Sequence, residues 1–109
     1  MIAKTPAPPY WTVIFSAIFS GREAEEYADT AARMVALAEE SPGFLGYETA
    51  QGEGGFEITV SYWESEEAIR AWKRNADHLA AQQRGREAFY AAYHIRVGKV
   101  ERAYGASST

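Results

Sequence analysis

The chain has 109 residues, of which 47% are hydrophobic and 24% charged, so it can build one hydrophobic core but is too short for two. Fifteen acidic and eleven basic residues give a net charge of -4 without a basic cluster, which argues against a nucleic-acid partner. The chain has no cysteine and two histidines, which excludes disulfides and thiol catalysis and argues against a metal site built from side chains alone.

Residues 5–21 carry no charge and follow Lys4, so a secretory signal has to be considered. Prolines interrupt the start of this stretch, polar residues interrupt its apolar part, and no pair of small residues suited to cleavage follows it. It is also shorter than the ~20 residues that cross a bilayer as a helix. We therefore expect a cytoplasmic protein with no membrane partner, in which residues 1–10 form an extended arm, residues 11–104 one domain and residues 105–109 a flexible tail.

The domain is predicted to begin with a strand and a helix. Residues 11–19 form the strand, which is apolar and ends near Gly21. Residues 23–40 form an amphipathic helix, because apolar side chains recur at helical spacing along one face and most charged side chains lie outside that face. A Pro-Gly pair at residues 42–43 ends the helix.

Two further strands are predicted at residues 44–49 and 56–63, on either side of a glycine-rich segment at residues 51–55. A glycine-rich loop that binds phosphate would lead into a helix. This one leads into a strand with apolar side chains at every second position, so we interpret it as a hairpin turn.

The second helical region covers residues 65–92 and starts at a serine that can cap the first turn, followed by two glutamates that complement the helix dipole. A glycine and a polar middle predict a bend between Trp72 and His78, with a second helical segment through Phe89. Residues 94–104 form the fourth strand. The order of elements is therefore βαββαβ.

The first strand is apolar on both faces, although two helices can cover only one face of a four-stranded antiparallel sheet. A second copy of the chain, packed sheet to sheet, would bury the other face, so the sequence predicts a homodimer. The residues on one face are Trp11, Val13, Phe15, Ala17 and Phe19, and those on the other are Tyr10, Ile14 and Ile18.

Several short motifs resemble those of the antibiotic biosynthesis monooxygenase (ABM) superfamily of dimeric α+β barrels. They are the Pro42-Gly43-Phe44 turn before the second strand, the Trp63-Glu64-Ser65 start of the second helix, Trp72 on that helix, and the Val97-Gly98-Lys99 strand near the end. The resemblance covers roughly residues 11–104. It implies an α+β, ferredoxin-like βαββαβ fold with a four-stranded antiparallel sheet that forms a dimeric barrel.

The superfamily includes monooxygenases that oxidise aromatic polyketides with dioxygen and without a cofactor. This resemblance implies such a reaction on a small aromatic substrate. It implies no cofactor and no metal ion. Trp72 is then the wall of the pocket and His78 the base or hydrogen-bond donor, since imidazole titrates near neutral pH. Trp63, Tyr62 and Asn75 are further candidates for substrate binding. Six residues separate Trp72 from His78, which leaves them about 120° apart on a straight helix, so a bend is needed for them to converge.

Two alternatives remain open. The superfamily also contains haem-degrading enzymes, which carry an Asn on the first strand and an axial His nine or ten residues after the Trp. Here residues 15–17 contain no Asn, and Ala81 and Gln82 stand at the later positions. The third possibility is a non-catalytic dimer that binds a small apolar ligand, which the aromatic content of 14% would equally suit.

Overall fold

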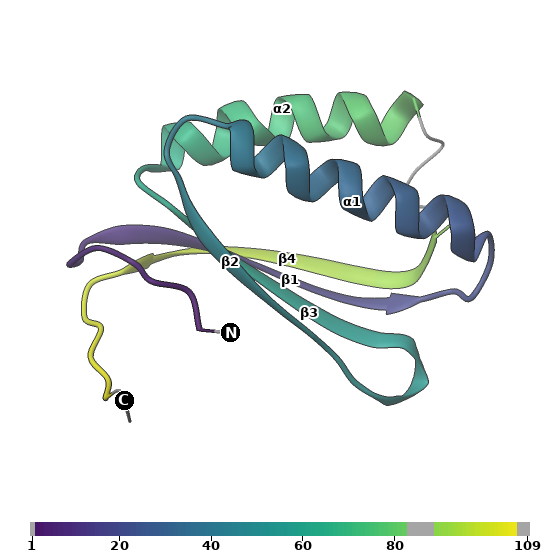
Figure 1. Ribbon diagram of the computed structural model, residues 1–109, viewed down its shortest axis with the longest axis horizontal. Coiled ribbons are helices and arrows are strands. Elements are labelled where there is room, and N and C mark those ends of the chain that lie inside the picture. The colour runs from purple at the N-terminus through teal and green to yellow at the C-terminus, as the bar shows by residue number, and fades with distance from the viewer. Residues whose placement is uncertain (1, 83–88, 107–109) are drawn as a thin grey trace.

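The computed structural model describes residues 2–82 and 89–106. Its four strands form one antiparallel sheet in the order β2-β3-β1-β4, and both helices lie on the same face of it (Figure 1). This arrangement confirms the predicted α+β, ferredoxin-like fold. The elements are β1 (Tyr10–Phe19), α1 (Ala24–Glu40), β2 (Phe44–Gln51), the short 3-10 helix η1 (Glu53–Gly55), β3 (Phe56–Trp63), α2 (Glu66–Gln82) and β4 (Tyr90–Val100).

The register of the sheet assigns each side chain to the helix-covered face or to the open face. Val13 of β1 lies opposite Ser61 of β3 and Val97 of β4, and residues that lie opposite one another point to the same side. Val13 is buried under the helices, so the odd-numbered residues of β1 face them. The core cluster on this face consists of Val13, Ala38, Trp63 and Ile69.

Helix α2 runs without interruption through the segment where a bend was predicted, so that prediction is wrong. Its buried side chains, Ile69 and Ala76, lie on the same side as Trp72 and hold a straight helix against the sheet. On its exposed side, ion pairs four residues apart support the same conformation; one joins Lys73 to Asp77 at 2.7 Å. The polar middle of this segment is therefore the solvated face of one helix.

The start of the fourth strand was also predicted wrongly. Tyr90 pairs with Phe19 of β1, so β4 begins there and residues 90–92 are strand instead of helix. The aromatic rings of Tyr90 and Tyr93 pack against Phe15, which favours an extended chain here. The strand ends at Val100, earlier than predicted, while the expected helical segment between residues 83 and 88 lies outside the described residues.

The turn before β2 packs closely on the start of α2. Gly43 has a φ of 86°, and a Cβ at this position would lie 2.7 Å from the Cβ of Ala68, so a larger residue would push the two elements apart. The carbonyl oxygen of Gly43 accepts a hydrogen bond from the amide of Glu64 at 2.8 Å. Ser65 caps α2 as predicted, since its Oγ accepts from the amide of Ala68 at 3.1 Å.

The other face of the sheet has no helix over it, and the chain leaves the sheet on that side at both termini (Figure 1). Ile18 and Phe56, which lie opposite each other, are 41% and 42% exposed there. The N-terminal arm covers one end of this face, because the amide of Ala3 donates to Oε2 of Glu48 at 3.0 Å. Within the described residues, neither helix is long and apolar enough to cross a membrane.

Candidate active site

Two tryptophans meet between α2 and the sheet. The ring of Trp72 packs 5.3 Å from that of Trp63, at an angle of 39°. Trp63 is fully buried, and its Nε1 donates a hydrogen bond to Oγ of Ser61 at 2.9 Å. The Nε1 of Trp72 is also buried but has no acceptor in the described part of the chain. A buried donor without a partner is costly and uncommon, so Trp72 is the side chain here that an additional acceptor would satisfy.

A groove with a volume of about 290 Å³ reaches Trp72 from the surface. It lies between the turn at residues 41–43 and the first turns of α2. Trp72 and Asn75 line it from α2, together with Glu64 and Ser65 at the start of that helix. Its volume is just below the range usual for small-molecule sites.

The structure brings Trp72 and Asn75 to this groove but not His78. Because α2 is straight, His78 lies about 120° around the helix from Trp72, and it is exposed, as is Asn75. His78 has an interaction partner of its own. The convergence of Trp72 and His78 that the sequence suggested depended on the bend that α2 does not have.

Tyr62 lies on the opposite face of the sheet from Trp72, since it follows the even-numbered positions of β1. Its hydroxyl donates to Oε1 of Glu48 at 2.5 Å, and its ring meets that of Tyr10 edge to face. Partial burial, followed by the hydrogen bond to Glu48, raises the pKa of Tyr62 to about 12. The hydrogen bonds from Tyr62 and from the amide of Ala3 hold the pKa of Glu48 below its usual value. Tyr62 thus lies on the open face of the sheet, next to the N-terminal arm, and away from Trp72.

A second polar cluster lies on the helix-covered face, at the end of the sheet where α1 begins. Glu57 of β3 is 8% exposed and accepts a hydrogen bond from the hydroxyl of Tyr27 of α1 at 2.5 Å. The ring of Tyr27 stacks on Phe19 at 4.3 Å and meets Tyr90 edge to face at 5.8 Å. Burial, and then the hydrogen bond to Glu57, raise the pKa of Tyr27 well above its usual range.

Sequence reasoning missed this cluster, although a signal for it exists. Glu57 occupies the same face of β3 as Ser61 and Trp63, which the helices cover. The alternation of strand residues assigns Glu57 to the core, where a carboxylate needs a hydrogen-bond donor. The helix predicted over residues 23–40 contains one tyrosine, whose hydroxyl could be that donor. Together these observations would have suggested a buried pair.

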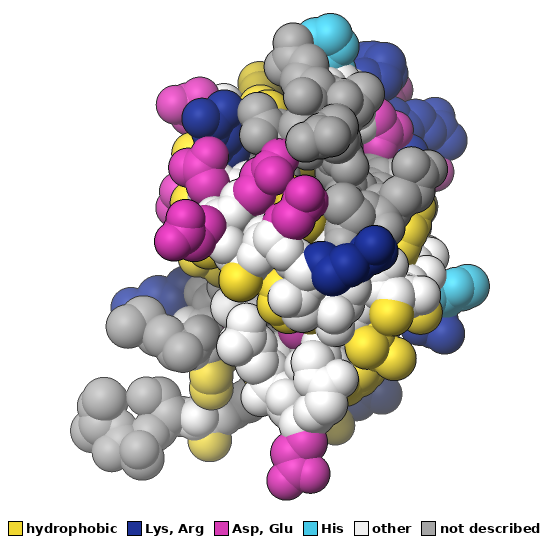
Figure 2. All heavy atoms as spheres, turned by 90° about the vertical axis from the view of Figure 1, so that its right-hand side faces the viewer, with side chains coloured by type: hydrophobic (Ala, Val, Ile, Leu, Met, Phe, Trp, Pro, Cys, Tyr) yellow, Lys and Arg dark blue, Asp and Glu magenta, His cyan; other side chains and the backbone are white. Residues whose placement is uncertain are grey.

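The surface near this cluster is acidic. Seen from the end where α1 begins, acidic side chains gather over the first part of that helix (Figure 2). Glu25 and Glu26 stand in its first turn, one and two residues before Tyr27. Basic side chains lie beside them at the same end of the molecule (Figure 2).

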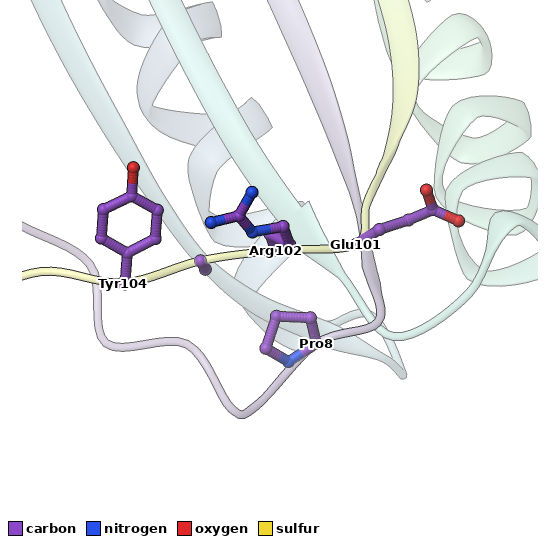
Figure 3. A pocket seen from close by; sticks show the side chains of 5 residues that line it. Pro8, Glu101, Arg102 and Tyr104 are labelled. Atoms are coloured by element: carbon purple, nitrogen blue, oxygen red, sulfur yellow. The ribbon is translucent and has the colours of Figure 1, made fainter.

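A larger hollow, of about 430 Å³, lies away from both clusters, between the N-terminal arm and the chain after β4 (Figure 3). Pro8, Glu101, Arg102 and Tyr104 line it, and the guanidinium of Arg102 lies 5.6 Å from the centre of the Tyr104 ring. Both segments that form it lie outside the strands, so it offers no rigid wall for positioning a substrate. The described residues contain no cluster of three or more His, Cys, Asp or Glu side chains that could hold a metal ion.

The fold defines a class of small α+β proteins in which two helices cover one face of a four-stranded antiparallel sheet. The sequence model of the family "Antibiotic biosynthesis monooxygenase" matches residues 12–84. The chain belongs to this family. It is also 48% identical over 101 residues to the uncharacterized protein YqjZ of Bacillus subtilis, an alignment that covers 93% of this chain and 88% of YqjZ.

Solved structures share the fold at lower identity. SnoaB, a cofactor-independent oxygenase from Streptomyces nogalater, aligns with a TM-score of 0.70 and 16% identity over 88% of this chain and 97% of its own. MhuD, in a mutant with two manganese protoporphyrin IX molecules bound per active site, aligns with a TM-score of 0.64 and 22% identity over 88% of this chain and 99% of its own. At these identities the likeness establishes the fold.

Proposed function

We propose that the protein is a cofactor-independent monooxygenase that oxidises a small, neutral aromatic substrate with dioxygen. The observation that carries this proposal is the buried Nε1 of Trp72, which has no acceptor among the described residues although a groove reaches its side chain. A phenol, phenolate or carbonyl oxygen on the substrate would supply that acceptor. Membership of the monooxygenase family and the shared fold with SnoaB support the reaction class.

The aromatic surroundings of Trp72 suit a flat substrate. Trp63 packs against the Trp72 ring and is itself hydrogen bonded to Ser61, which limits the orientations that the Trp72 indole can take. Asn75, at the groove, can donate or accept a further hydrogen bond. These contacts position the ring and stabilise negative charge on the oxygen nearest Trp72 as the substrate ionises.

The chemistry requires a substrate that reacts with dioxygen once it has lost a proton. A phenol becomes a phenolate, passes an electron to dioxygen, and combines with the resulting superoxide to form a peroxide on a ring carbon that bears hydrogen. Loss of water leaves a quinone, so one oxygen atom enters the product and the other leaves as water. The protein contributes orientation, a water-poor site and charge stabilisation.

A panel of polycyclic phenols and hydroquinones tests the reaction in an oxygen electrode, with ¹⁸O₂ as a label. We expect oxygen uptake, no turnover under anaerobic conditions, and one ¹⁸O atom in the quinone product. Conversion without oxygen, or no uptake with any member of the panel, would show that the proposal is wrong. Buffer alone is the control, because electron-rich phenols oxidise slowly by themselves.

Haem binding is the second candidate, because Trp72 stands on α2 in a fold that MhuD shares and MhuD binds a metalloporphyrin. The exposed side chain of His78 would be its ligand. A titration with haemin decides between the candidates. If micromolar protein leaves the Soret band of haemin unshifted, or if His78→Ala shifts it as the wild type does, haem ligation by His78 is wrong.

We further propose that the protein acts as a cytoplasmic homodimer. The chain has no cysteine, so its fold does not depend on disulfides that need an oxidising compartment. On the open face of the sheet, Ile18 and Phe56 form part of an apolar surface that a second copy, placed with its own open face against the first, would bury.

A further inference from the structure

The strands place two side chains that are charged at neutral pH on the open face of the sheet, one acidic and one basic. Val60 of β3 lies opposite Glu48 of β2 and opposite Ile14 of β1. Ile14 in turn lies opposite Arg96 of β4. These four residues therefore form one row across the sheet and point to the same side. Three gaps of about 4.8 Å between neighbouring strands put Glu48 and Arg96 roughly 14 Å apart, too far to pair within one chain.

Both charged groups can take a further partner. Arg96 is exposed, and none of the ion pairs among the described residues includes it or Glu48. Glu48 is partly exposed and accepts hydrogen bonds from the hydroxyl of Tyr62 and the amide of Ala3. An ionised carboxylate can accept about four hydrogen bonds, so Glu48 has acceptor capacity left for a guanidinium group.

The row is complementary to a reversed copy of itself, because it has an acid at one end, a base at the other and apolar side chains between them. A two-fold axis that runs along the strands, between two facing sheets, lays β2 of one copy over β4 of the other and β3 over β1. This rotation leaves positions along the strands unchanged, so Glu48 faces the partner's Arg96, and the same pair forms a second time. Facing sheets pack about 10 Å apart, a gap that a long acidic and a long basic side chain can bridge together.

The other possible axis lacks this complementarity. A two-fold axis across the strands would keep β2 over β2 and β4 over β4, so the acid of one copy would never reach the base of the other. The apolar residues also agree with the axis along the strands. Ile18 of β1 and Phe56 of β3 lie opposite each other, and both are exposed. An axis that lays β1 over β3 places Ile18 against the partner's Phe56, so apolar side chains meet at the centre and charges at the edges.

We propose that Glu48 and Arg96 form reciprocal ion pairs between two copies of the chain and thereby select the orientation of the homodimer. The inference rests on the homodimer proposed above and names the residues that fix its axis. Exposed ion pairs add little affinity, whereas like charges brought face to face oppose a wrong arrangement. The apolar centre therefore holds the two copies together, and the charges at the edges decide how they are turned.

Reversal of one charge tests the pairing. Arg96→Glu brings a carboxylate opposite Glu48 at both edges, so we expect the dissociation constant of the dimer to rise at least about tenfold at low salt, and less at high salt. Lys99→Glu is the matched control, because it makes the same change of charge on the same strand but on the helix-covered face. It should stay within about threefold of the wild type. The double variant Glu48→Arg/Arg96→Glu restores opposite charges and should recover part of the loss. Sedimentation equilibrium measures all four constants.

Cross-linking reports the orientation itself, because the chain has no cysteine of its own. Chains with Glu48→Cys are mixed with chains with Arg96→Cys and treated with a bis-maleimide whose reach matches the about 10 Å between packed sheets. The mixture should give covalent dimers, and each variant alone should give far fewer, because the axis keeps equal positions at opposite edges. Cross-linking of either variant with itself, and none in the mixture, would overturn the proposed axis.

The outcomes separate the pairing from the dimer. If the wild type is dimeric but Arg96→Glu and Lys99→Glu have the same dissociation constant, the pairing is wrong and the homodimer stands. If the wild type is monomeric at micromolar concentration, both are wrong and the open face belongs to another partner. Should Arg96→Glu fail to fold, cross-linking in the mixture decides.

Discussion

The two tryptophans that touch in the core differ in how their indole N–H groups are satisfied. Trp63 donates to Ser61, whereas Trp72 has no acceptor in the described part of the chain. For stability alone, the second arrangement is inferior, since an aromatic side chain without the N–H would avoid the cost. The difference between the two neighbours is the reason to assign ligand binding to Trp72 and a supporting role to Trp63.

This assignment predicts that substitution of Trp63 mainly lowers stability, whereas substitution of Trp72 mainly weakens ligand binding. Trp63→Phe should lower the free energy of unfolding by roughly 1–3 kcal/mol, because it breaks a buried hydrogen bond and leaves a cavity. Trp72→Phe should cost less stability but weaken binding of a polycyclic quinone about tenfold, through loss of one hydrogen bond. Urea denaturation and fluorescence titration measure the two quantities. Equal affinity of Trp72→Phe and the wild type would contradict the assignment.

Substitution of His78 tests whether this residue takes part in the reaction at the Trp72 site. It is exposed on a straight helix, about 120° around from Trp72. We therefore expect His78→Ala to keep kcat within about twofold of the wild type, because general acid–base catalysis needs a group within hydrogen-bond reach of the substrate. A pH–rate profile of both proteins is the measurement. If the pH–rate profile of His78→Ala lacked an inflection near neutral pH that the wild type shows, His78 would be the catalytic base after all.

At the scale of elements, the contact between the N-terminal arm and β2 depends on pH. Tyr62 and the amide of Ala3 lower the pKa of Glu48 from its ordinary 4.5, so this contact stabilises the arm above that pH and is lost as the pH falls further. The pKa of Tyr62 is raised from 10.0 to about 12, so its contribution is complete below pH 10.0 and is lost as the pH rises toward 12.

The arm should therefore be released in acid before the domain unfolds. Limited proteolysis with an acid-active protease should cut within residues 2–9 faster as the pH falls below 4.5, while circular dichroism stays unchanged. In Glu48→Ala, which lacks both acceptor oxygens, the arm should already be cut fast at the upper end of the protease's pH range and show little further dependence on pH. An arm equally resistant at all pH values would refute the role of Glu48.

The strands could be predicted closely from the sequence because their signals are local. The alternation of apolar side chains in residues 56–63 matches β3 residue for residue, and the Pro-Gly pair at residues 42–43 marks the end of α1. The same reasoning failed at β4, which starts at Tyr90 because that residue pairs with Phe19 across the sheet. Pairing between distant residues leaves no periodic signal of its own.

The site was predicted less well than the fold for a related reason. Trp72 was proposed as a pocket residue because the short motifs around this helix resemble those of the family, and such motifs are local information. Whether His78 converges with it depends on helix curvature, which packing against the sheet decides. The pair formed by Tyr27 and Glu57 joins residues thirty positions apart. The period of two marks Glu57 as a buried carboxylate, but that Tyr27 is its partner follows from the packing of α1 on the sheet.

At the scale of the whole molecule, the open face of the sheet predicts a homodimer. The arm covers only one end of this face, near Glu48, and leaves Ile18 and Phe56 exposed. A stable interface buries about 800 Å² per partner, which is within reach of one face of a four-stranded sheet. The two helices already occupy the other face, so a second copy is the covering that the fold itself can supply (Figure 1).

Sedimentation equilibrium should therefore give a mass of about twice the 12.1 kDa of one chain. Ile18→Glu places a charge on the open face and should produce a monomer or an aggregate, because a buried unpaired carboxylate opposes the interface. Val97→Glu is the matched control, since Val97 is similarly exposed but lies on the helix-covered face, and it should remain dimeric. A wild type that stays monomeric at micromolar concentration would show that the open face is not an interface between two copies.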